Sequence, residues 1–330
     1  MYVPATLGAA LILMLTSMVC WGSWPNLLKK LPTWRLEYFY LDFTLGLLIT
    51  ALIYGAVLGS GDTGAPDFFG RLAHSGSRVV MLAVVGGFIW NIGNILLLNG
   101  IMIAGLAVAF PIAAIPAIVL GIGASYWLNP VGNAMVLTSS VVLFLLAAQL
   151  TAAAYRRLGS VASGHRAKGV AVALISGLLI GFFPPFVSAA ISGSSGSPGL
   201  DAYTVSAFFA LGSCAATLVT LPILIRRPLV GEPGLLGGYL RGKTSWHLWG
   251  ILAGAVWCSG TVLNFISAGL VGIAISVGVG CGAPMVGALW GVLVWGEFSK
   301  GQRSAKVLVW AAMALYAVGV TAMAVAYTMR

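Results

Sequence analysis

Long apolar stretches constrain this sequence more than any other feature. Ten can be read, each near 20 residues and separated from the next by a polar connection: 6–24, 38–58, 79–99, 102–124, 132–154, 169–190, 202–225, 248–267, 270–295 and 306–327. An α-helix needs about 20 apolar residues to cross a hydrocarbon core roughly 30 Å thick. In a helix the backbone N–H and C=O groups hydrogen-bond within the same segment, which is necessary in a bilayer because no water is present to bond them. The sequence therefore predicts an all-α membrane protein with ten transmembrane helices.

The composition supports this prediction and excludes a soluble globular protein. Hydrophobic residues make up 60% of the chain and charged residues only 7%, with a mean hydropathy of +1.02. Soluble domains carry about 25% charged residues. The first stretch, residues 6–24, has no basic leader and ends in Trp-Gly-Ser-Trp-Pro. We therefore interpret it as a retained helix and not as a signal peptide.

The second half of the chain repeats the first. An offset of 167 residues separates Trp90 from Trp257 and Gly105 from Gly272, with similar residues between them. Five helices per half would invert the second copy in the membrane, which is typical of secondary transporters. We predict a first five-helix repeat at 1–158, a cytoplasmic connecting loop at 159–168 and a second repeat at 169–330. Together they form two inverted repeats.

The basic residues are distributed unevenly between the two sides of the membrane. Connections after odd-numbered stretches and their flanks hold fourteen lysines and arginines, whereas the other side holds Arg71, Arg78 and Arg330. Cytoplasmic loops carry the excess of basic residues. This predicts a multi-pass protein of the plasma (bacterial inner) membrane with both termini on the outer side. The formal charge of +10 therefore needs no nucleic-acid partner.

Asp42 is the acidic residue predicted to lie deepest in a helix. It follows Tyr38 by four residues, which places it roughly 6 Å into the second helix at about 1.5 Å per residue. A carboxylate at membrane depth costs about 3 kcal/mol and needs a cavity, a partner or a proton. We predict that Asp42 is the proton-coupling site. The alternative is a structural salt bridge to Arg35 or Lys29.

The other two acidic residues near predicted helices lie at their ends. Glu37 is closer to the membrane boundary than Asp42, and we expect it to pair with basic loop residues. Glu297 ends the ninth stretch beside Lys300. We interpret Glu297 as one member of an interfacial ion pair and not as a ligand-binding residue.

Neutral polar and aromatic side chains inside helices are candidates for holding a substrate. Asn91 and Asn94 share one helix face, and Thr261 and Asn264 repeat their spacing in the second half. Amides both donate and accept hydrogen bonds, and neighbouring indoles can stack on a planar ligand. Packing and interhelical hydrogen bonding are the alternatives. The predicted substrate-binding residues are Trp21, Trp24, Trp90, Asn91, Asn94, Trp257, Thr261 and Asn264.

Prolines within or at the ends of helices free backbone carbonyls. In a bilayer, freed carbonyls must face protein or a water-filled cavity. Such prolines therefore indicate a central path, with a simple packing kink as the alternative for each: Pro25, Pro111, Pro116, Pro184, Pro185 and Pro284.

Enzymatic chemistry finds little support in the sequence. The four cysteines lie in predicted helices without metal-ligand spacing. His74, His165 and His247 all fall in predicted loops, so no Ser/His/Asp or Cys/His arrangement is expected. Residues 237–244 match a nucleotide-binding loop letter for letter, but no buried strand precedes them. We predict no enzyme, no metal, no cofactor and no ATP hydrolysis.

Several motifs resemble those of the ureide permeases, a family of the drug/metabolite transporter superfamily that is more distantly related to bacterial sugar permeases of the glucose/rhamnose type. They include Gly22-Ser-Trp-Pro25, Tyr40-Leu-Asp42, Gly105-Leu-Ala-Val108 and Trp290-Gly-Val-Leu-Val-Trp-Gly-Glu297. The resemblance implies the five-plus-five fold of that superfamily and proton-coupled uptake of allantoin, uracil and similar heterocycles. It also places Asp42 at the family's Tyr-Leu-Asp position.

The chain departs from the family in two places. Plant members have a longer central loop, and Gly260-Thr-Val-Leu-Asn264 stands where the family favours Gly-Asn-x-Leu-Gln. We predict a secondary active transporter that takes up a small neutral polar solute, ureide or nucleobase first, by alternating access. Its partners are the solute, protons and the lipid bilayer. A sugar:proton symporter, or a metabolite or drug exporter of the same superfamily, are the alternatives, and the oligomeric state is left open.

Overall fold

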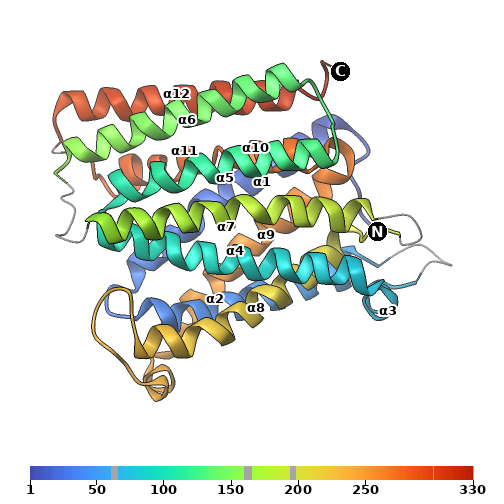
Figure 1. The fold of residues 1–330 in the computed structure, drawn as a ribbon, viewed down its shortest axis with the longest axis horizontal. Coiled ribbons are helices and arrows are strands. Elements are labelled where there is room, and N and C mark those ends of the chain that lie inside the picture. The colour runs from blue at the N-terminus through green and yellow to red at the C-terminus, as the bar shows by residue number, and fades with distance from the viewer. Residues whose placement is uncertain (61–65, 160–165, 194–197, 300, 330) are drawn as a thin grey trace.

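The computed structural model describes residues 1–60, 66–159, 166–193, 198–299 and 301–329. Within these ranges it contains ten helical spans long and apolar enough to cross a membrane, and no strand. The predicted ten-helix membrane fold is confirmed (Figure 1). The spans of the first half are α1 (Leu7–Ser23) with the 3-10 turn η1 (Trp24–Lys30), α2 (Leu36–Leu58), α4 (Ser77–Ala104), α5 (Leu106–Leu128) and α6 (Ala134–Arg157).

The second half has the same number of spans. They are α7 (Arg166–Ser192), α8 (Ala202–Arg226), α9 (Thr244–Val271), the broken span α10 (Ile273–Gly280) with α11 (Ala283–Leu289) and the π-helical turn η3 (Trp290–Val294), and α12 (Arg303–Val325). Two short helices, α3 (Phe68–His74) and η2 (Leu236–Arg241), lie in connections. The helices α4 and α9 are longer than their apolar stretches suggested.

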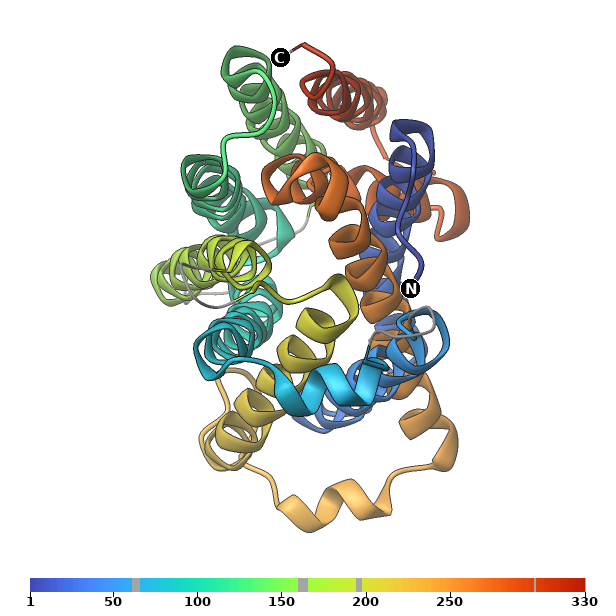
Figure 2. The same cartoon turned by 90° about the vertical axis from the view of Figure 1, so that its right-hand side faces the viewer.

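The spans form one elongated bundle (Figure 1). The helices α6 and α12 pack together along one edge, and α2 and α8 along the opposite edge. The N-terminus and the end of α12 lie at the same end of the bundle, as an even number of crossings requires. The other end carries the connection 227–243, which loops away from the bundle in Figure 2. We call this the basic end, because Lys29, Arg35 and Lys243 lie there.

Four glycines show that the halves repeat one helix contact. The helix α2 crosses α9 at Gly46 and Gly254, and α4 crosses α8 at Gly87 and Gly212. A Cβ added at any of the four would clash with a carbonyl oxygen of the facing helix. The distance would be 2.1 Å at Gly46 and 1.9 Å at Gly254 in the first crossing, and 1.9 Å at Gly87 and 2.0 Å at Gly212 in the second. Small residues let helices approach closely where lipid supplies no hydrophobic drive. The same close crossing is therefore built twice.

A second pair of glycines joins consecutive spans without a loop. Gly105 links α4 to α5 with φ 79° and ψ 155°, and Gly272 links α9 to α10 with φ 81° and ψ 155°. Each amide donates to the carbonyl four residues earlier, at 2.8 Å. Only glycine adopts such positive φ angles without a steric cost. These matched turns are consistent with the predicted repeat.

Candidate solute-binding cavity

The irregular parts of the first and ninth spans meet at a cavity of about 400 Å³. In the first span, Pro25 follows directly on the change from α-helix to the tighter 3-10 turn η1. In the ninth, Pro284 follows the break between α10 and α11. Both prolines line the cavity, together with residues of α4, α5 and α6. Of the six prolines predicted to mark a central path, Pro25 and Pro284 therefore line a cavity; that the cavity belongs to a path stays a prediction.

Three of the predicted substrate-binding residues line this cavity. Trp21 and Trp24 do so from the first span, and Asn94 does so from α4. The apolar wall includes Leu97 and Phe110. The amide nitrogen of Asn94 is buried, and the side chain interacts with the buried hydroxyl of Tyr40. The cavity wall therefore combines aromatic side chains with an amide side chain.

Other predicted residues lie behind the cavity wall and support it. Trp257 stacks against Trp21, with ring centroids 6.0 Å apart, and against Trp90 at 3.8 Å. The indole N–H of Trp21 donates to Thr261 Oγ1 at 3.1 Å. Stacked aromatic pairs add about 0.5–1.5 kcal/mol to their burial. Trp90, Trp257 and Thr261 therefore fix the orientation of Trp21 but do not face the cavity.

Asn91 and Asn264 connect neighbouring helices. Asn91 Nδ2 donates to the Ser213 carbonyl at 3.0 Å and to Thr217 Oγ1 at 2.7 Å, which joins α4 to α8. Asn264 Nδ2 donates to the Ser276 carbonyl at 2.7 Å, which joins α9 to α10. From the sequence, both asparagines were predicted to bind the substrate. The structure places them in helix interfaces, which favours the alternative of interhelical hydrogen bonding.

Asp42 is buried at the basic end and has two polar partners. Its side chain is 1% exposed. The hydroxyl of Tyr239 in η2 donates to Asp42 Oδ1 at 2.5 Å, and His247 Nδ1 lies 3.0 Å from both carboxylate oxygens. Asp42 is absent from the residues that line the cavity. The carboxylate therefore belongs to a separate polar cluster of α2, η2 and α9.

The structure corrects two expectations about this cluster. Arg35, offered as an alternative partner of Asp42, pairs instead with Glu37 at 3.2 Å. This pairing agrees with the expectation for Glu37. His247 was expected in a loop but lies in the first turn of α9, because that helix starts at Thr244. His74 likewise lies in α3, whereas His165 lies outside the described residues.

The titration of Tyr239 keeps its hydroxyl available as a donor. Burial, followed by the hydrogen bond to Asp42 and the charge of its carboxylate, raises the pKa of Tyr239 above its ordinary value. Because the pKa of Tyr239 is higher in the folded than in the unfolded state, its protonation contributes to the free energy of unfolding. This contribution is fully present below the unfolded-state pKa of about 10. That stability is lost as the pH rises through the folded-state pKa. The hydroxyl of Tyr239 therefore stays protonated, and able to donate to Asp42, across the physiological pH range.

Comparison with known proteins identifies the family. A model of the family described as ureide permease matches residues 39–168 and 155–326. The chain belongs to the ureide permease family. It is 24% identical to ureide permease 1 of Arabidopsis thaliana and 25% identical to ureide permease 4 of the same plant, covering 97% of both chains in each case. It is also 24% identical to probable ureide permease A3 of Vigna unguiculata, covering 90% of this chain and 97% of that one.

A solved structure supports the fold alone. Its title reads "Crystal structure of protein", and it superposes with a TM-score of 0.66 at 15% identity, covering 96% of both chains. Family membership and ten apolar spans together establish an integral, multi-pass membrane transporter and not an enzyme. The alignment to ureide permease 1 runs over 387 positions. This exceeds the 330 residues of the chain, so that relative carries insertions.

Three residues that line the cavity of this ureide permease form its polar rim and were not predicted as site residues from the sequence: Lys29, Tyr155 and Glu297. Lys29 of η1 forms an ion pair with Glu297, and the hydroxyl of Tyr155 in α6 donates to Glu297 Oε2 at 2.8 Å. All three residues line the cavity. Lys29, the other alternative partner of Asp42, is thus paired elsewhere. Lys300, expected beside Glu297, lies outside the described residues. The predicted ion pair exists, but its partner comes from a different span.

Indole donors also join the first span to the ninth at this rim. Trp290 Nε1 donates to Ser23 Oγ at 2.9 Å, and Trp295 Nε1 donates to Asn26 Oδ1 at 2.7 Å. Asn26 itself lines the cavity. Gly-Ser-Trp-Pro and Trp-Gly-x-x-x-Trp-Gly-Glu, two of the motifs that suggested the family, therefore meet in space.

Proposed function

We propose that this permease takes up a small neutral ureide or nucleobase, coupled to protons, by alternating access. The names of the relatives supply the solute class, since they are called ureide permeases. The distribution of basic residues supports a plasma (bacterial inner) membrane orientation in which the basic end is cytoplasmic. The cavity would then be closer to the cytoplasm than to the outside. The two five-helix repeats, 1–158 and 169–330, would move against each other around the cavity.

The cavity between the first and ninth spans is the observation that carries this proposal. Its volume of about 400 Å³ falls within the roughly 300–1,000 Å³ usual for small-molecule sites. Trp21 and Trp24 offer faces on which a flat heterocycle can stack. Asn94 adds an amide side chain to the cavity wall, a group that can hydrogen-bond the N–H and C=O groups of a ureide. Apolar walls around a few polar groups are the usual pattern of such sites.

Asp42 is the residue that we assign to proton coupling. It is buried at the basic end, where an uncompensated carboxylate would be costly. Its partner His247 places Nδ1 3.0 Å from both carboxylate oxygens. Because Asp42 lies outside the cavity wall, its protonation would act on the solute through the packing of α2 against α9. Tyr239 and His247 would hold the ionised carboxylate in place.

Thermal stabilisation of the purified protein tests the solute class. Allantoin, uracil, xanthine, rhamnose and glucose would each be added at rising concentration. A ligand present at 100 times its dissociation constant stabilises by about 2.7 kcal/mol. We expect allantoin or uracil to raise the melting temperature and the sugars to leave it unchanged. Stabilisation by a sugar alone would favour the sugar symporter instead.

A matched pair of tryptophan variants locates the binding site. Trp24→Ala removes a ring of the cavity wall and should weaken the stabilisation by ligand. Trp127→Ala removes a ring that is 82% exposed and should preserve it. Equal ligand responses in both variants would place the solute elsewhere.

A further inference from the structure

The chain after the ninth span folds so that Glu297 returns to the cavity. The span ends in the π-helical turn Trp290–Val294, and Gly296 then reverses the chain with φ 61°. The amide of Glu297 donates to the Gly291 carbonyl at 2.9 Å. A Cβ on Gly291 would lie 2.6 Å from Glu297 Oε2. The carboxylate therefore packs closely against Gly291.

The contacts of Glu297 leave it able to accept further hydrogen bonds. Lys29 approaches Oε1 and Tyr155 donates to Oε2. A carboxylate has about four acceptor positions, so about two remain. The side chains of Lys29 and Glu297 are 41% and 28% exposed, so the pair is open and not sealed in the protein. Among the described residues that line the cavity, Glu297 is the only acid.

The ion pair between Lys29 and Glu297 has no counterpart at the repeat-related positions. Gly22 and Pro25 of the first span match Gly181 and Pro184 of the sixth at an offset of 159 residues, which places Ser188 at the position of Lys29. The offset of 167 residues places Pro130 at the position of Glu297. The glycine crossings between the halves and the glycine turns, by contrast, each occur twice. A contact needed only to pack one half against the other would likewise be expected twice. The single occurrence points to a role in transport.

We propose that Glu297 binds the transported solute by accepting a hydrogen bond from a ring N–H, and that it selects solutes carrying such a group. This inference rests on the proposed function. Lys29 and Tyr155 hold the ionised carboxylate at the rim while the cavity is empty. An N–H donor of the solute then takes a remaining acceptor position, and the aromatic faces of Trp21 and Trp24 receive its ring. Charged acceptors form stronger hydrogen bonds than neutral ones.

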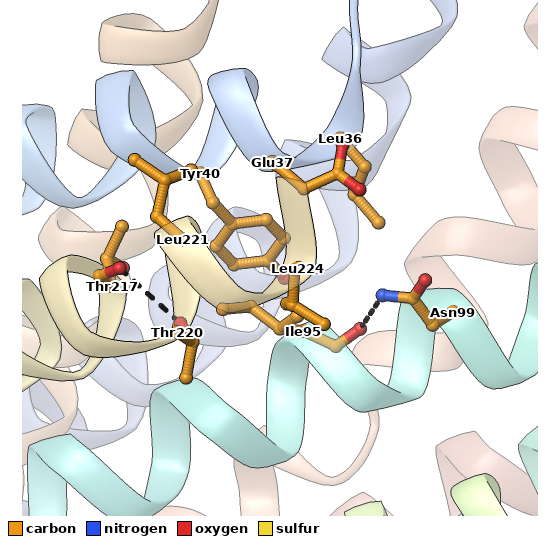
Figure 3. A pocket seen from close by; sticks show the side chains of 9 residues that line it. All are labelled: Leu36, Glu37, Tyr40, Ile95, Asn99, Thr217, Thr220, Leu221 and Leu224. Atoms are coloured by element: carbon orange, nitrogen blue, oxygen red, sulfur yellow. Dashed lines mark hydrogen bonds between the residues drawn. The ribbon is translucent and has the colours of Figure 1, made fainter. Parts of the chain in front are cut away.

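Glu37 supplies a matched control. It lies at the same end of the bundle and is paired with Arg35. Figure 3 shows it beside Leu36, with Tyr40 and Leu221 in the wall of a separate small pocket between α2, α4 and α8. Glu37 does not line the large cavity. Glu37→Gln therefore removes a charge of the same kind at the same end of the bundle without touching the proposed site.

The experiment compares uracil with 1,3-dimethyluracil, in which both ring N–H groups are methylated. Binding to purified wild type, Glu297→Gln and Glu37→Gln is measured by ligand-dependent thermal stabilisation. We expect wild type and Glu37→Gln to prefer uracil. Exchanging a charged for a neutral acceptor should lower that preference roughly tenfold in Glu297→Gln. Glu297→Asp keeps the charge and should retain part of the preference.

The outcomes separate the two proposals. If Glu297→Gln discriminates between the two compounds as strongly as wild type does, the inference is overturned. If wild type binds no ureide or nucleobase at all, the proposed function fails and takes this inference with it. A cooperative melting transition measured without ligand shows that each variant is folded. A preference lost in Glu37→Gln as well would show a general effect of charge at the basic end and would also overturn the inference.

Discussion

Gly254→Ala tests the close crossing of α2 and α9 on which the bundle depends. A Cβ at Gly254 would lie 1.9 Å from the Phe43 carbonyl oxygen. Carbon–oxygen contacts are normally about 3.3 Å or longer, so the helices must separate by roughly 1.4 Å. Overpacking of this kind costs about 1–3 kcal/mol. The entropy of unfolding is about 2.1 cal/mol/K per residue, or about 0.7 kcal/mol/K for 330 residues, so we expect a melting temperature about 1–4 °C lower.

The assay is the melting temperature of the purified protein, with Gly269→Ala as the control in the same helix. A Cβ at Gly269 would meet nothing within 4 Å, so alanine there should be neutral or stabilising by up to about 1 kcal/mol. Gly87→Ala, the repeat-related change, should cost about as much as Gly254→Ala, because its Cβ would also lie 1.9 Å from a carbonyl oxygen. Equal melting temperatures for Gly254→Ala and Gly269→Ala would refute the reasoning.

Three further changes test the proposed site and its proton coupling. Asp42→Asn should abolish proton-driven accumulation in proteoliposomes but preserve exchange of labelled for unlabelled solute; undiminished accumulation would remove Asp42 from coupling. Trp24→Ala should weaken solute binding about tenfold, since stacking on an aromatic side chain contributes about 1–3 kcal/mol per base; titration of thermal stabilisation measures this, and unchanged affinity would exclude stacking on that ring. Tyr239→Phe should destabilise while the hydroxyl of Tyr239 is protonated, and the difference should shrink as the pH rises above the unfolded value of about 10 and through the raised folded-state pKa of Tyr239; melting curves above pH 9 check this, and a difference that stays the same at high pH would contradict it.

The spans could be predicted from sequence because a bilayer allows few structures. Hydropathy located all ten, and the boundaries were the weak point. The helix α9 starts at Thr244, earlier than its apolar stretch, because polar residues such as His247 form the helix turn at the membrane boundary. This error concealed the contact between His247 and Asp42. The role of Tyr239 was also hidden, since 197 residues separate it from Asp42.

The cavity could be predicted only in part. Trp21, Trp24 and Asn94 stood out as polar or aromatic groups inside apolar windows, and they line the cavity. Lys29, Tyr155 and Glu297 lie at the ends of three different spans, where charges usually meet water. Hydropathy carries no information about which ends converge. The fold alone shows that the first, fifth and ninth spans bring these residues together.

Solute uptake into proteoliposomes tests the central claim, that this permease carries a ureide or nucleobase through the cavity with protons. Labelled allantoin and uracil would be supplied outside, with the interior buffered at a higher pH than the exterior. The account predicts that at least one of them accumulates above its external concentration and that a protonophore abolishes the accumulation. Uptake that reaches the same level with and without the proton gradient would contradict it.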